Sequence, residues 1–293
     1  MDADAIARIR RFNRAVAREI GALDDSYLGN GRPLGSARVL CAIGPAGREV
    51  SALREELELD AGLLSRTLAG LAREGLVVLS RDAGDGRRRR AAWTDAGRAE
   101  AARYDRLSDE RAARVLAAHS GAAGQRLLAA MDLVAAALNR AHVAIAPVDP
   151  EAPAARACVA RYYAELALRF EDGFDPARAL QPDAAELRPP AGAMLLAAAD
   201  GQPLGCVAVR KSDNDVADIK RLWVAPESRG LGLATRLMAA AEAEARRLGA
   251  TAVRLDTNRA LTEAIALYRA RGYSEMPPFN AEPHADHWFV KTL

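Results

Sequence analysis

The sequence has few cysteines and histidines and no long apolar run. Its three cysteines, Cys41, Cys158 and Cys206, are isolated and odd in number, which fits reduced residues in apolar surroundings better than disulfides or a metal site. Among the four histidines, only His284 and His287 lie close together, and no cysteine stands beside them. No segment of about 18 residues is wholly apolar, and the charged, amphipathic N-terminus lacks the apolar region of a signal peptide. These absences predict a soluble, cytoplasmic protein with no metal site and no membrane span.

Lysine is missing from the first half of the chain. Residues 1–145 contain 23 Arg, no Lys and 19 acidic residues, a net charge of +4, whereas the remainder has 18 basic and 20 acidic residues, a net charge of −2. The basic excess suggests a polyanionic partner for the first half. With 293 residues, of which 50% are hydrophobic, the chain is long enough for two domains that each bury a core.

One segment of the second half has the pattern of a strand, a glycine-rich turn and a long helix. Residues 222–226 are a short apolar run that ends at a proline, which predicts a buried strand. Residues 235–248 carry apolar side chains at helical spacing, which predicts an amphipathic helix of about four turns. Between them, Gly230 and Gly232 remove two side chains where the first N–H groups of the helix have no partner. Glycine pairs also serve tight packing, but a helix start of this kind favours an anion site.

The turn itself, Arg229-Gly230-Leu231-Gly232-Leu233-Ala234, lacks the lysine of a Walker loop and the third glycine of a dinucleotide fingerprint. It resembles motif A of the GNAT family of N-acetyltransferases, whose pattern is Arg/Gln-x-x-Gly-x-Gly/Ala. The resemblance implies acetyl-CoA as acyl donor, with its pyrophosphate on the backbone of the turn and its pantetheine arm on the backbone of the preceding strand. The cofactor-binding residues implied in this way are Leu222, Trp223, Val224, Arg229, Gly230, Leu231, Gly232, Leu233, Ala234 and Thr235.

Two residues are candidates for the chemistry of acetyl transfer. The segment around Tyr268 resembles the family's Leu-Tyr-x-x-x-Gly-Phe/Tyr motif, which implies that its hydroxyl lies near the thioester sulfur as a general acid. The alternative is a tyrosine that packs on the sheet. Asp218 stands where the family often has a glutamate that acts as general base, and its shorter side chain favours a water relay. The alternative is an ion pair with Lys220 on the same face of the strand.

Aromatic residues near the C-terminus are candidates for an acceptor pocket or for the core, namely Phe279, His284, His287, Trp288 and Phe289.

The first half has the pattern of a winged helix-turn-helix. Apolar stripes predict helices over residues 5–23 and 34–43, and then two short helices, one over residues 50–59 and one that starts after an N-cap at Asp60 and carries Leu63, Leu64, Leu68 and Leu71. Residues 76–79 and 90–93 flank a polar stretch with glycines and four consecutive arginines, which predicts a hairpin.

This order of elements resembles the MarR family of transcription regulators. Asp85 and Arg87 match its wing and Thr94 and Gly97 match the turn after it, whereas Trp93 replaces a leucine. The resemblance implies a homodimer built by the first helix and the helices around residues 98–118 and 126–140. It also implies binding of double-stranded DNA, with Ala61, Gly62, Ser65 and Arg66 at the major groove and Arg87 at the minor groove. The arginine run, Arg87, Arg88, Arg89 and Arg90, is either a phosphate-binding wing or a solvated tip.

We therefore expect two domains. Residues 1–142 form a mainly α winged helix-turn-helix domain, and residues 143–293 form an α/β (α+β) GNAT fold with the order β-α-β-β-β-α-β-α-β-β in a mixed, mostly antiparallel sheet. The expected function is a bifunctional MarR-like regulator and acetyl-CoA-dependent N-acetyltransferase of a small amine, amino-acid-like compounds among the candidates. The first alternative is a regulator whose GNAT domain senses acetyl-CoA or acyl-CoA without turnover. The second is a winged domain that only dimerises.

Overall fold

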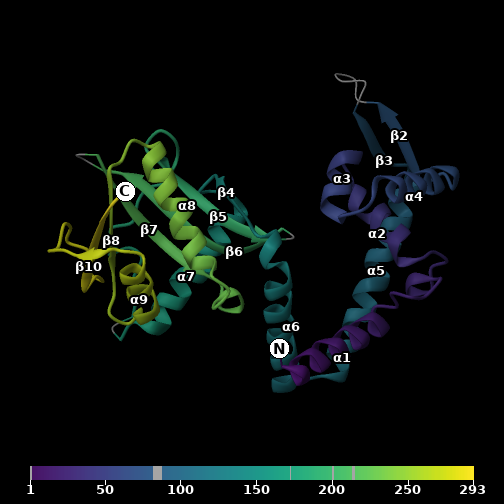
Figure 1. Ribbon diagram of the computed structural model, residues 1–293, viewed down its shortest axis with the longest axis horizontal. Helices are drawn as coiled ribbons and strands as arrows, with labels where there is room; N and C mark the ends of the chain where they lie inside the picture. Colours follow the sequence, from purple (N-terminus) through teal and green to yellow (C-terminus); the bar gives the residue numbers. More distant parts are fainter. Residues whose placement is uncertain (1, 82–87, 172, 200, 213–214) are drawn as a thin grey trace. The chain divides into compact units, whose positions relative to one another are not determined.

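The computed structural model describes residues 2–81, 88–171, 173–199, 201–212 and 215–293. The chain forms two compact units, Met1–Gly124 and Gln125–Leu293 (Figure 1). The change from one unit to the other falls within helix α6 (Gly121–Leu138). The domain division at residues 142 and 143 stays a prediction.

The first unit has the helices and the hairpin that the sequence predicts. A buried cluster that includes Leu40, Leu53 and Tyr104 holds its elements together. Its described strands form one sheet in the order β1-β3-β2. The elements are α1 (Ala3–Glu19), α2 (Leu34–Ile43), β1 (Arg48–Glu49), α3 (Val50–Leu57), α4 (Ala61–Arg73), β2 (Val77–Arg81), β3 (Arg89–Trp93) and α5 (Asp95–Ala118).

Local contacts explain the helix-turn-helix. Asp60 caps α4 as predicted, because its carboxylate accepts hydrogen bonds from the backbone N–H groups of Gly62 (2.9 Å) and Leu63 (3.0 Å). Glu58 takes a left-handed conformation, with φ of 52°, at the end of α3 and so turns the chain toward α4. Leu64, Leu68 and Leu71 are buried as expected, but Leu63 is 45% exposed, so its assignment to the inner stripe is wrong.

The helical stretch Gly121–His142 is the one described segment that is long and apolar enough to cross a membrane by length and composition. It has 22 residues, its most apolar 18-residue window has a mean hydropathy of 1.2, and 11% of that window is buried. Length and hydropathy alone are weak evidence for a membrane span, because core helices of soluble proteins also have them.

The second unit follows the predicted order of strands and helices. In its described part, seven strands form one mixed sheet in the order β4-β5-β6-β7-β8-β10-β9, in which β7 and β8 are parallel and the other neighbours are antiparallel. The elements are β4 (Ala144–Val148), α7 (Pro153–Arg169), β5 (Gly192–Ala199), β6 (Gln202–Lys211), β7 (Val216–Val224), α8 (Leu233–Arg247), β8 (Ala252–Thr257), α9 (Thr262–Ala270), β9 (Ser274–Glu275) and β10 (His287–Thr292).

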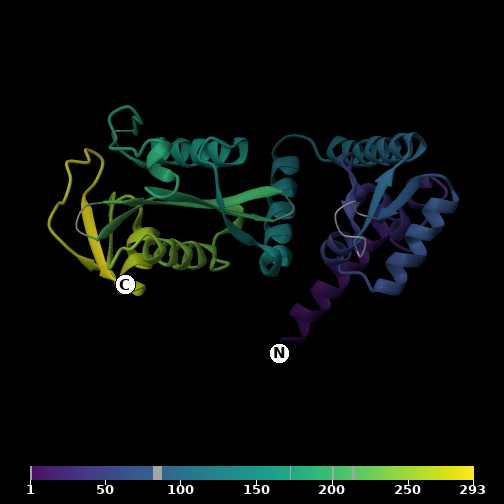
Figure 2. The same cartoon turned by 90° about the horizontal axis from the view of Figure 1, so that it is seen from above.

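The sheet of the second unit is buried on both faces. Alternate side chains of β6 belong to different cores: Val207 and Val209 pack with α8, whereas Cys206 and Ala208 pack with Cys158 of α7. Figure 2 shows α7 on one face of the sheet and α8 and α9 on the other. The three cysteines are free thiols, as predicted.

The parallel strands β7 and β8 separate partway along their length. Val216–Asp218 pairs with Ala252–Arg254, and beyond Asp218 no further β7–β8 pair occurs among the described residues. The register of β6 and β7 shifts at the same level, and Arg221 there has φ of 55°, a left-handed conformation that is costly for a residue with a side chain. Because the two strands separate here, the sheet opens next to the glycine turn.

Candidate functional site

A cavity of about 410 Å³ lies beside the end of β7. Its walls come from α7, the last residues of β7, the glycine turn and α9. Eight of the ten residues predicted to bind a cofactor line it, whereas Leu231 and Thr235 do not. The eight are Leu222, Trp223, Val224, Arg229, Gly230, Gly232, Leu233 and Ala234.

The glycine turn leaves the start of α8 open. Gly230 and Gly232 have φ of 75° and 79°, which glycine adopts without strain. A Cβ at Gly230 would meet nothing within 4 Å, so backbone conformation rather than crowding explains this glycine. Gly232 is the N-cap of α8 and supplies no capping side chain. The first N–H groups of α8 therefore remain available to an anion.

Arg229, in this turn, is already engaged by the protein. Its Nε donates to the carbonyl oxygen of Val224 (3.0 Å), and its Nη2 donates to Oε2 of Glu165 (2.5 Å), which also accepts from Trp223 Nε1 (2.8 Å). Burial raises the pKa of Glu165, but the hydrogen bonds from Arg229 and Trp223 outweigh it and hold that pKa below its ordinary value. Glu165 therefore stays ionised and offsets the charge of Arg229, which leaves the backbone as the main anion-binding group.

Ser228 adds an unsatisfied polar group to the cavity wall. The residue is 2% exposed, and its Oγ has no hydrogen-bond partner among the described residues. A buried hydroxyl without a partner is uncommon and suggests that a ligand satisfies it.

A second, smaller lobe of about 80 Å³ adjoins the first cavity. Five residues line both lobes and form a common wall between them, namely Tyr162, Leu166, Leu222, Leu261 and Ala264. The second lobe lies where β7 and β8 have separated, since Lys220 of β7 and Asp256 of β8 both line it.

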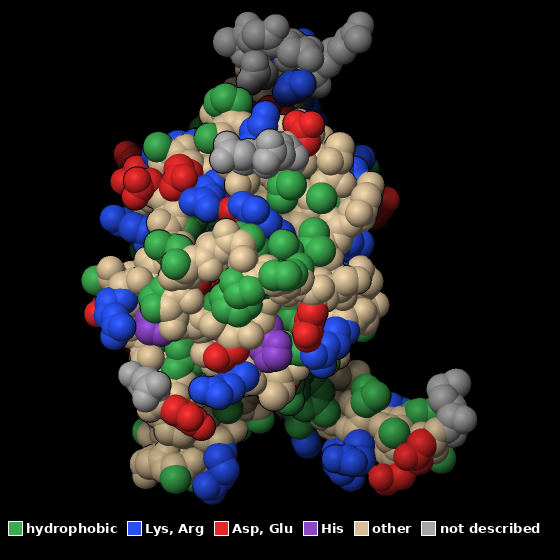
Figure 3. All heavy atoms as spheres, turned by 90° about the vertical axis from the view of Figure 1, so that its left-hand side faces the viewer, with side chains coloured by type: hydrophobic (Ala, Val, Ile, Leu, Met, Phe, Trp, Pro, Cys, Tyr) green, Lys and Arg blue, Asp and Glu red, His purple; other side chains and the backbone are tan. Residues whose placement is uncertain are grey.

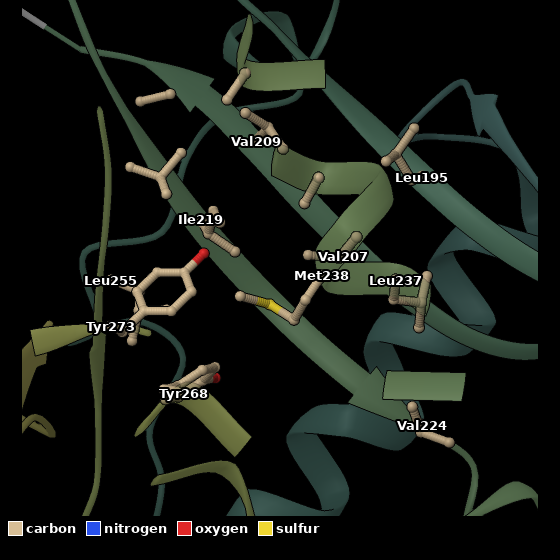
Figure 4. Close-up of a cluster of buried hydrophobic side chains, with 14 of the residues drawn as sticks. Leu195, Val207, Val209, Ile219, Val224, Leu237, Met238, Leu255, Tyr268 and Tyr273 are labelled. Carbon is tan, nitrogen blue, oxygen red and sulfur yellow. The ribbon is translucent and has the colours of Figure 1, made fainter. Parts of the chain in front are cut away.

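Tyr268 lies in the wall of the second lobe and is 6% exposed. Its ring packs between Tyr273 and Phe289, with centroid distances of 5.9 Å and 5.8 Å. Figure 4 shows it among the apolar side chains of the core, near Tyr273 and Met238. Burial, with a smaller contribution from Asp256, raises the pKa of its phenol, so the hydroxyl is protonated at neutral pH. A protonated phenol is the form that a general acid requires.

Asp218 lines neither lobe. Its side chain is 1% exposed, and its two oxygens accept from Arg210 Nη2 (2.6 Å) and Arg254 Nε (2.7 Å). The expected alternative, a pair between Asp218 and Lys220, is wrong, because Lys220 pairs with Asp256. The cross-strand register explains this: Arg210 and Arg254 are the direct neighbours of Asp218 on β6 and β8. Direct neighbours are about 5 Å away, and the residue two positions along is about 6.6 Å away.

Of the aromatic residues near the C-terminus, only His284 lines the second lobe. Phe289 is fully buried in the core, and Phe279 stacks under the guanidinium of Arg254 at 4.1 Å. Trp288 donates to Asn280 Oδ1 (2.8 Å). Instead, aromatic walls come from Tyr162, Phe170 and Phe174, which sequence reasoning missed as site residues because they follow no motif.

In the first unit, the predicted DNA-binding residues divide into exposed and engaged groups. Ala61, Ser65 and Arg66 of α4 and Arg89 of β3 are exposed, and Gly62 is half-buried. Arg88 pairs with Glu49 (3.3 Å), and Arg90 donates through Nη2 to the carbonyl oxygens of Ala46 (2.7 Å) and Gly47 (3.0 Å). Arg87, with Asp85 of the predicted wing motif, lies outside the described residues.

Two segments of the chain match known families. Residues 159–273 match the acetyltransferase (GNAT) family, and residues 30–88 match the MarR family.

Several relatives match about a third of the chain or less. An uncharacterized N-acetyltransferase of Schizosaccharomyces pombe is 38% identical over 97 residues, 32% of this chain and 60% of that protein. An IAA acetyltransferase of Azospirillum brasilense is 35% identical over 86 residues, 29% of this chain and 56% of that protein. The chain thus spans about three fifths of the length of these relatives or slightly less.

Among solved structures, a GNAT-family acetyltransferase of Staphylococcus aureus is 17% identical with a TM-score of 0.42, and the match covers 51% of this chain and 99% of that one. A GNAT-family acetyltransferase of Elizabethkingia anophelis, solved with acetyl-CoA bound, is 16% identical with a TM-score of 0.37, and the match covers 52% of this chain and 98% of that one.

Proposed function

We propose that the protein is a DNA-binding regulator and an acetyl-CoA-dependent N-acetyltransferase of a small amine, because residues 30–88 match the MarR family and residues 159–273 match the acetyltransferase (GNAT) family. The observation that carries the enzymatic part is the cavity beside the splayed strands, with the open start of α8 at one end and Tyr268 in the adjoining lobe. A cytoplasmic location is part of the same proposal.

The residues of the larger lobe fit acetyl-CoA. The uncapped N–H groups at the start of α8 suit a pyrophosphate, and Ser228 offers a hydroxyl that lacks a partner among the described residues. The backbone of Leu222 and Val224 stands at the unpaired edge of β7, where a pantetheine arm can form hydrogen bonds. The match of residues 159–273 to the acetyltransferase (GNAT) family supports this choice of cofactor.

Acetyl-CoA supplies an acetyl group as a thioester. The acceptor amine attacks the carbonyl carbon, so a C–N bond forms, the C–S bond breaks, the amine loses a proton and the thiolate gains one. In the proposal, the protonated phenol of Tyr268 supplies the proton to the thiolate. The backbone N–H of Val224 polarises the carbonyl.

Two carboxylates are candidates for receiving the amine proton. The resemblance to the GNAT family gives the role of general base to Asp218, acting through a water molecule, although both of its oxygens accept hydrogen bonds from arginines. Asp256 is a candidate for the same role because it lines the second lobe together with Tyr268. The Asp218→Asn variant discussed below separates the two.

The test is release of free CoA from acetyl-CoA across a panel of small amines, with the native protein and with Tyr268→Phe. Turnover of one amine that falls about 100-fold or more in the variant supports the acid role. Acetyl-CoA binding without turnover of any amine would favour the alternative of a sensor.

Gly232→Glu tests the binding of the cofactor, because it places a negative side chain at the start of α8 in a left-handed backbone. Unchanged acetyl-CoA affinity in this variant would contradict the cofactor site.

The DNA-binding part of the proposal rests on the exposed face of α4. Asp60 fixes the start of the helix, and Ser65 and Arg66 are exposed on it. Arg66 and Arg89 are the described basic side chains best placed for phosphates, because Arg88 and Arg90 make contacts within the unit. Each phosphate contact adds about one unit to the slope of log affinity against log salt. Binding to double-stranded DNA fragments, with Arg66→Ala and Arg89→Ala each lowering that slope, supports the proposal; salt-independent binding or none contradicts it.

The proposed homodimer accounts for apolar surface in the first unit. Helix α1 buries no residue, and Ile9, Phe12 and Val16 are between 37% and 61% exposed. A second copy is the partner that the MarR resemblance implies for this face. Sedimentation of the native protein and of Ile9→Glu tests it: a dimer that becomes a monomer supports the assignment, and a native monomer contradicts it.

A further inference from the structure

We propose that the second lobe binds a zwitterionic acceptor of the α-amino acid class, an amine that also carries a carboxylate. The inference rests on the proposed acetyltransferase function and names the substrate class of that site. Two charged side chains carry it, Asp256 and Arg221, because each lines the lobe and has one polar atom, Oδ1 and Nη1 respectively, outside its hydrogen bonds to Lys220, Asn280, Gln181 and Pro182.

Asp256 offers a site for an ammonium group. Its Oδ2 accepts from Lys220 Nζ and from Asn280 Nδ2 (2.9 Å). Its Oδ1 accepts no hydrogen bond from any described residue. An acceptor nitrogen at Oδ1 would lie in the same lobe as the Tyr268 hydroxyl, which is where the reaction needs it.

Arg221 offers a site for a carboxylate. Its Nε donates to Gln181 Oε1 (3.1 Å) and its Nη2 donates to the carbonyl oxygen of Pro182 (3.0 Å), which fix the plane of the guanidinium. Nη1 takes part in neither of these two hydrogen bonds, and the hydroxyl of Tyr163 is a further neighbour that interacts with the same guanidinium. The backbone of Arg221 is held at φ of 55°, and strain of this kind concentrates at ligand sites. A fixed guanidinium is suited to a carboxylate.

The charges of the lobe balance, which selects among amines. Lys220 and Asp256 neutralise each other. Glu282 is also in the wall, and its carboxylate accepts from the backbone N–H groups of Leu180 (2.7 Å) and His284 (3.2 Å), so it offsets Arg221 within the lobe. A zwitterion adds no net charge. A simple monoamine adds one uncompensated positive charge beside Lys220 and Arg221, and a polyamine adds more.

The size and the apolar wall agree with this class. A lobe of about 80 Å³ holds on the order of five to eight water-sized groups, the size of a small amino acid. The rings of Phe170, Phe174 and His284 pack together, with centroid distances of 5.0 to 6.0 Å, and supply a surface for an apolar side chain. Figure 3 shows basic and acidic side chains interspersed on the outer face at the β10 end of this unit.

The experiment compares amino acids with the amines that lack only the carboxylate. L-valine is paired with 2-methylpropylamine and L-alanine with ethylamine, and kcat and KM are measured at saturating acetyl-CoA. We expect kcat/KM to favour an amino acid over its amine by about 10- to 100-fold, the range of a charge-assisted hydrogen bond. Arg221→Gln should raise KM for the amino acid and bring the ratio near one, and Arg221→Lys should restore part of it.

Controls separate the lobe from the fold and from the proposed function. Arg188→Gln makes the same chemical change at an arginine that pairs with Asp149 and Glu151 and lines neither lobe, so it should leave the ratio unchanged. Acetyl-CoA affinity, measured for each variant by calorimetry, identifies a variant that has lost its fold. If Arg221→Gln does not fold, the native ratio and Arg221→Lys decide.

Each outcome has a distinct meaning. Equal turnover of amino acids and amines, or a ratio that survives Arg221→Gln, overturns the zwitterion while the acetyltransferase stands. If no compound turns over, calorimetric binding of the amino acids to the CoA-saturated protein decides. Binding that weakens at least 10-fold in Arg221→Gln supports the ligand class and contradicts catalysis, and absence of binding overturns the inference together with the proposed function.

Discussion

Lys220 of β7 forms an ion pair with Asp256 of β8 at the level where the two strands no longer pair through their backbones. The last backbone pair between the two strands is Asp218 with Arg254. Two residues farther along each strand, the side chains of Lys220 and Asp256 make the contact instead. Both charged side chains are at most 10% exposed. The pair therefore spans the opening of the sheet and forms one wall of the second lobe.

Lys220→Met should destabilise the second unit. The change leaves the buried carboxylate of Asp256 with Asn280 as its one remaining partner among the described residues. Loss of one member of a buried ion pair typically costs about 3–5 kcal/mol. Chemical denaturation of the native protein and the variant measures this cost. Lys220→Met combined with Asp256→Leu should recover much of it, since no buried charge then remains; a single variant as stable as the native protein would contradict the account.

Asp218→Asn should affect stability more than chemistry. Two arginines lose the carboxylate between them, but Arg210 and Arg254 keep side-chain exposures of 29% and 24%, so water reduces the cost to about 2–3 kcal/mol. Because Asp218 lines neither lobe, we expect kcat to change less than about 10-fold. Denaturation and steady-state kinetics on the same preparation measure both quantities. A kcat loss of about 100-fold or more, at the normal pH optimum of a folded variant, would instead support the base role given by resemblance.

The glycine turn and the elements around it could be predicted because their signals are local. Gly230 and Gly232 mark the turn, a proline ends the strand before it, and helical spacing after it predicts α8; the structure has these elements with bounds close to those expected. The succession of strands and helices along the chain of the second unit could be predicted from the same kind of local signal.

The walls of the site could not be predicted in this way. Tyr162 and Leu166 belong to the inner face of α7, where the same apolar pattern would serve a closed core. They line a cavity because β7 and β8 separate beneath them. The partners of Asp218 depend on the register of three strands. The conformation of Arg221 depends on a shift between β6 and β7 that no residue signals in the sequence.

The stability of the second unit should fall in acid partly through Glu242. Burial raises the pKa of this carboxyl, but hydrogen bonds from Arg271 and Lys291 outweigh it, so the pKa lies below its ordinary value of 4.5. A carboxyl with a lowered pKa in the folded state contributes stability above its unfolded pKa, and this contribution is lost as the pH falls through the folded pKa. We expect Glu242→Gln to cost stability at pH 7 and to cost little at pH 3. Equal costs at the two pH values, measured by denaturation, would contradict the assignment.

Glu165→Gln should strengthen binding of acetyl-CoA. In the native protein the Glu165 carboxylate engages Arg229 and Arg169 and adds a negative charge to a cavity that is proposed to hold a polyanion. Glutamine can still accept from Trp223 Nε1, so the local packing is kept while Arg229 gains the freedom to meet a phosphate. The gain should be about 1 kcal/mol, roughly fivefold in Kd, and smaller at high salt. Calorimetry at two salt concentrations measures this gain in affinity.

Glu227→Gln is the matched control, because Glu227 pairs with Arg161 next to the same turn but does not line the cavity. An equal effect of the two substitutions would mean that general charge, rather than the release of Arg229, governs the affinity.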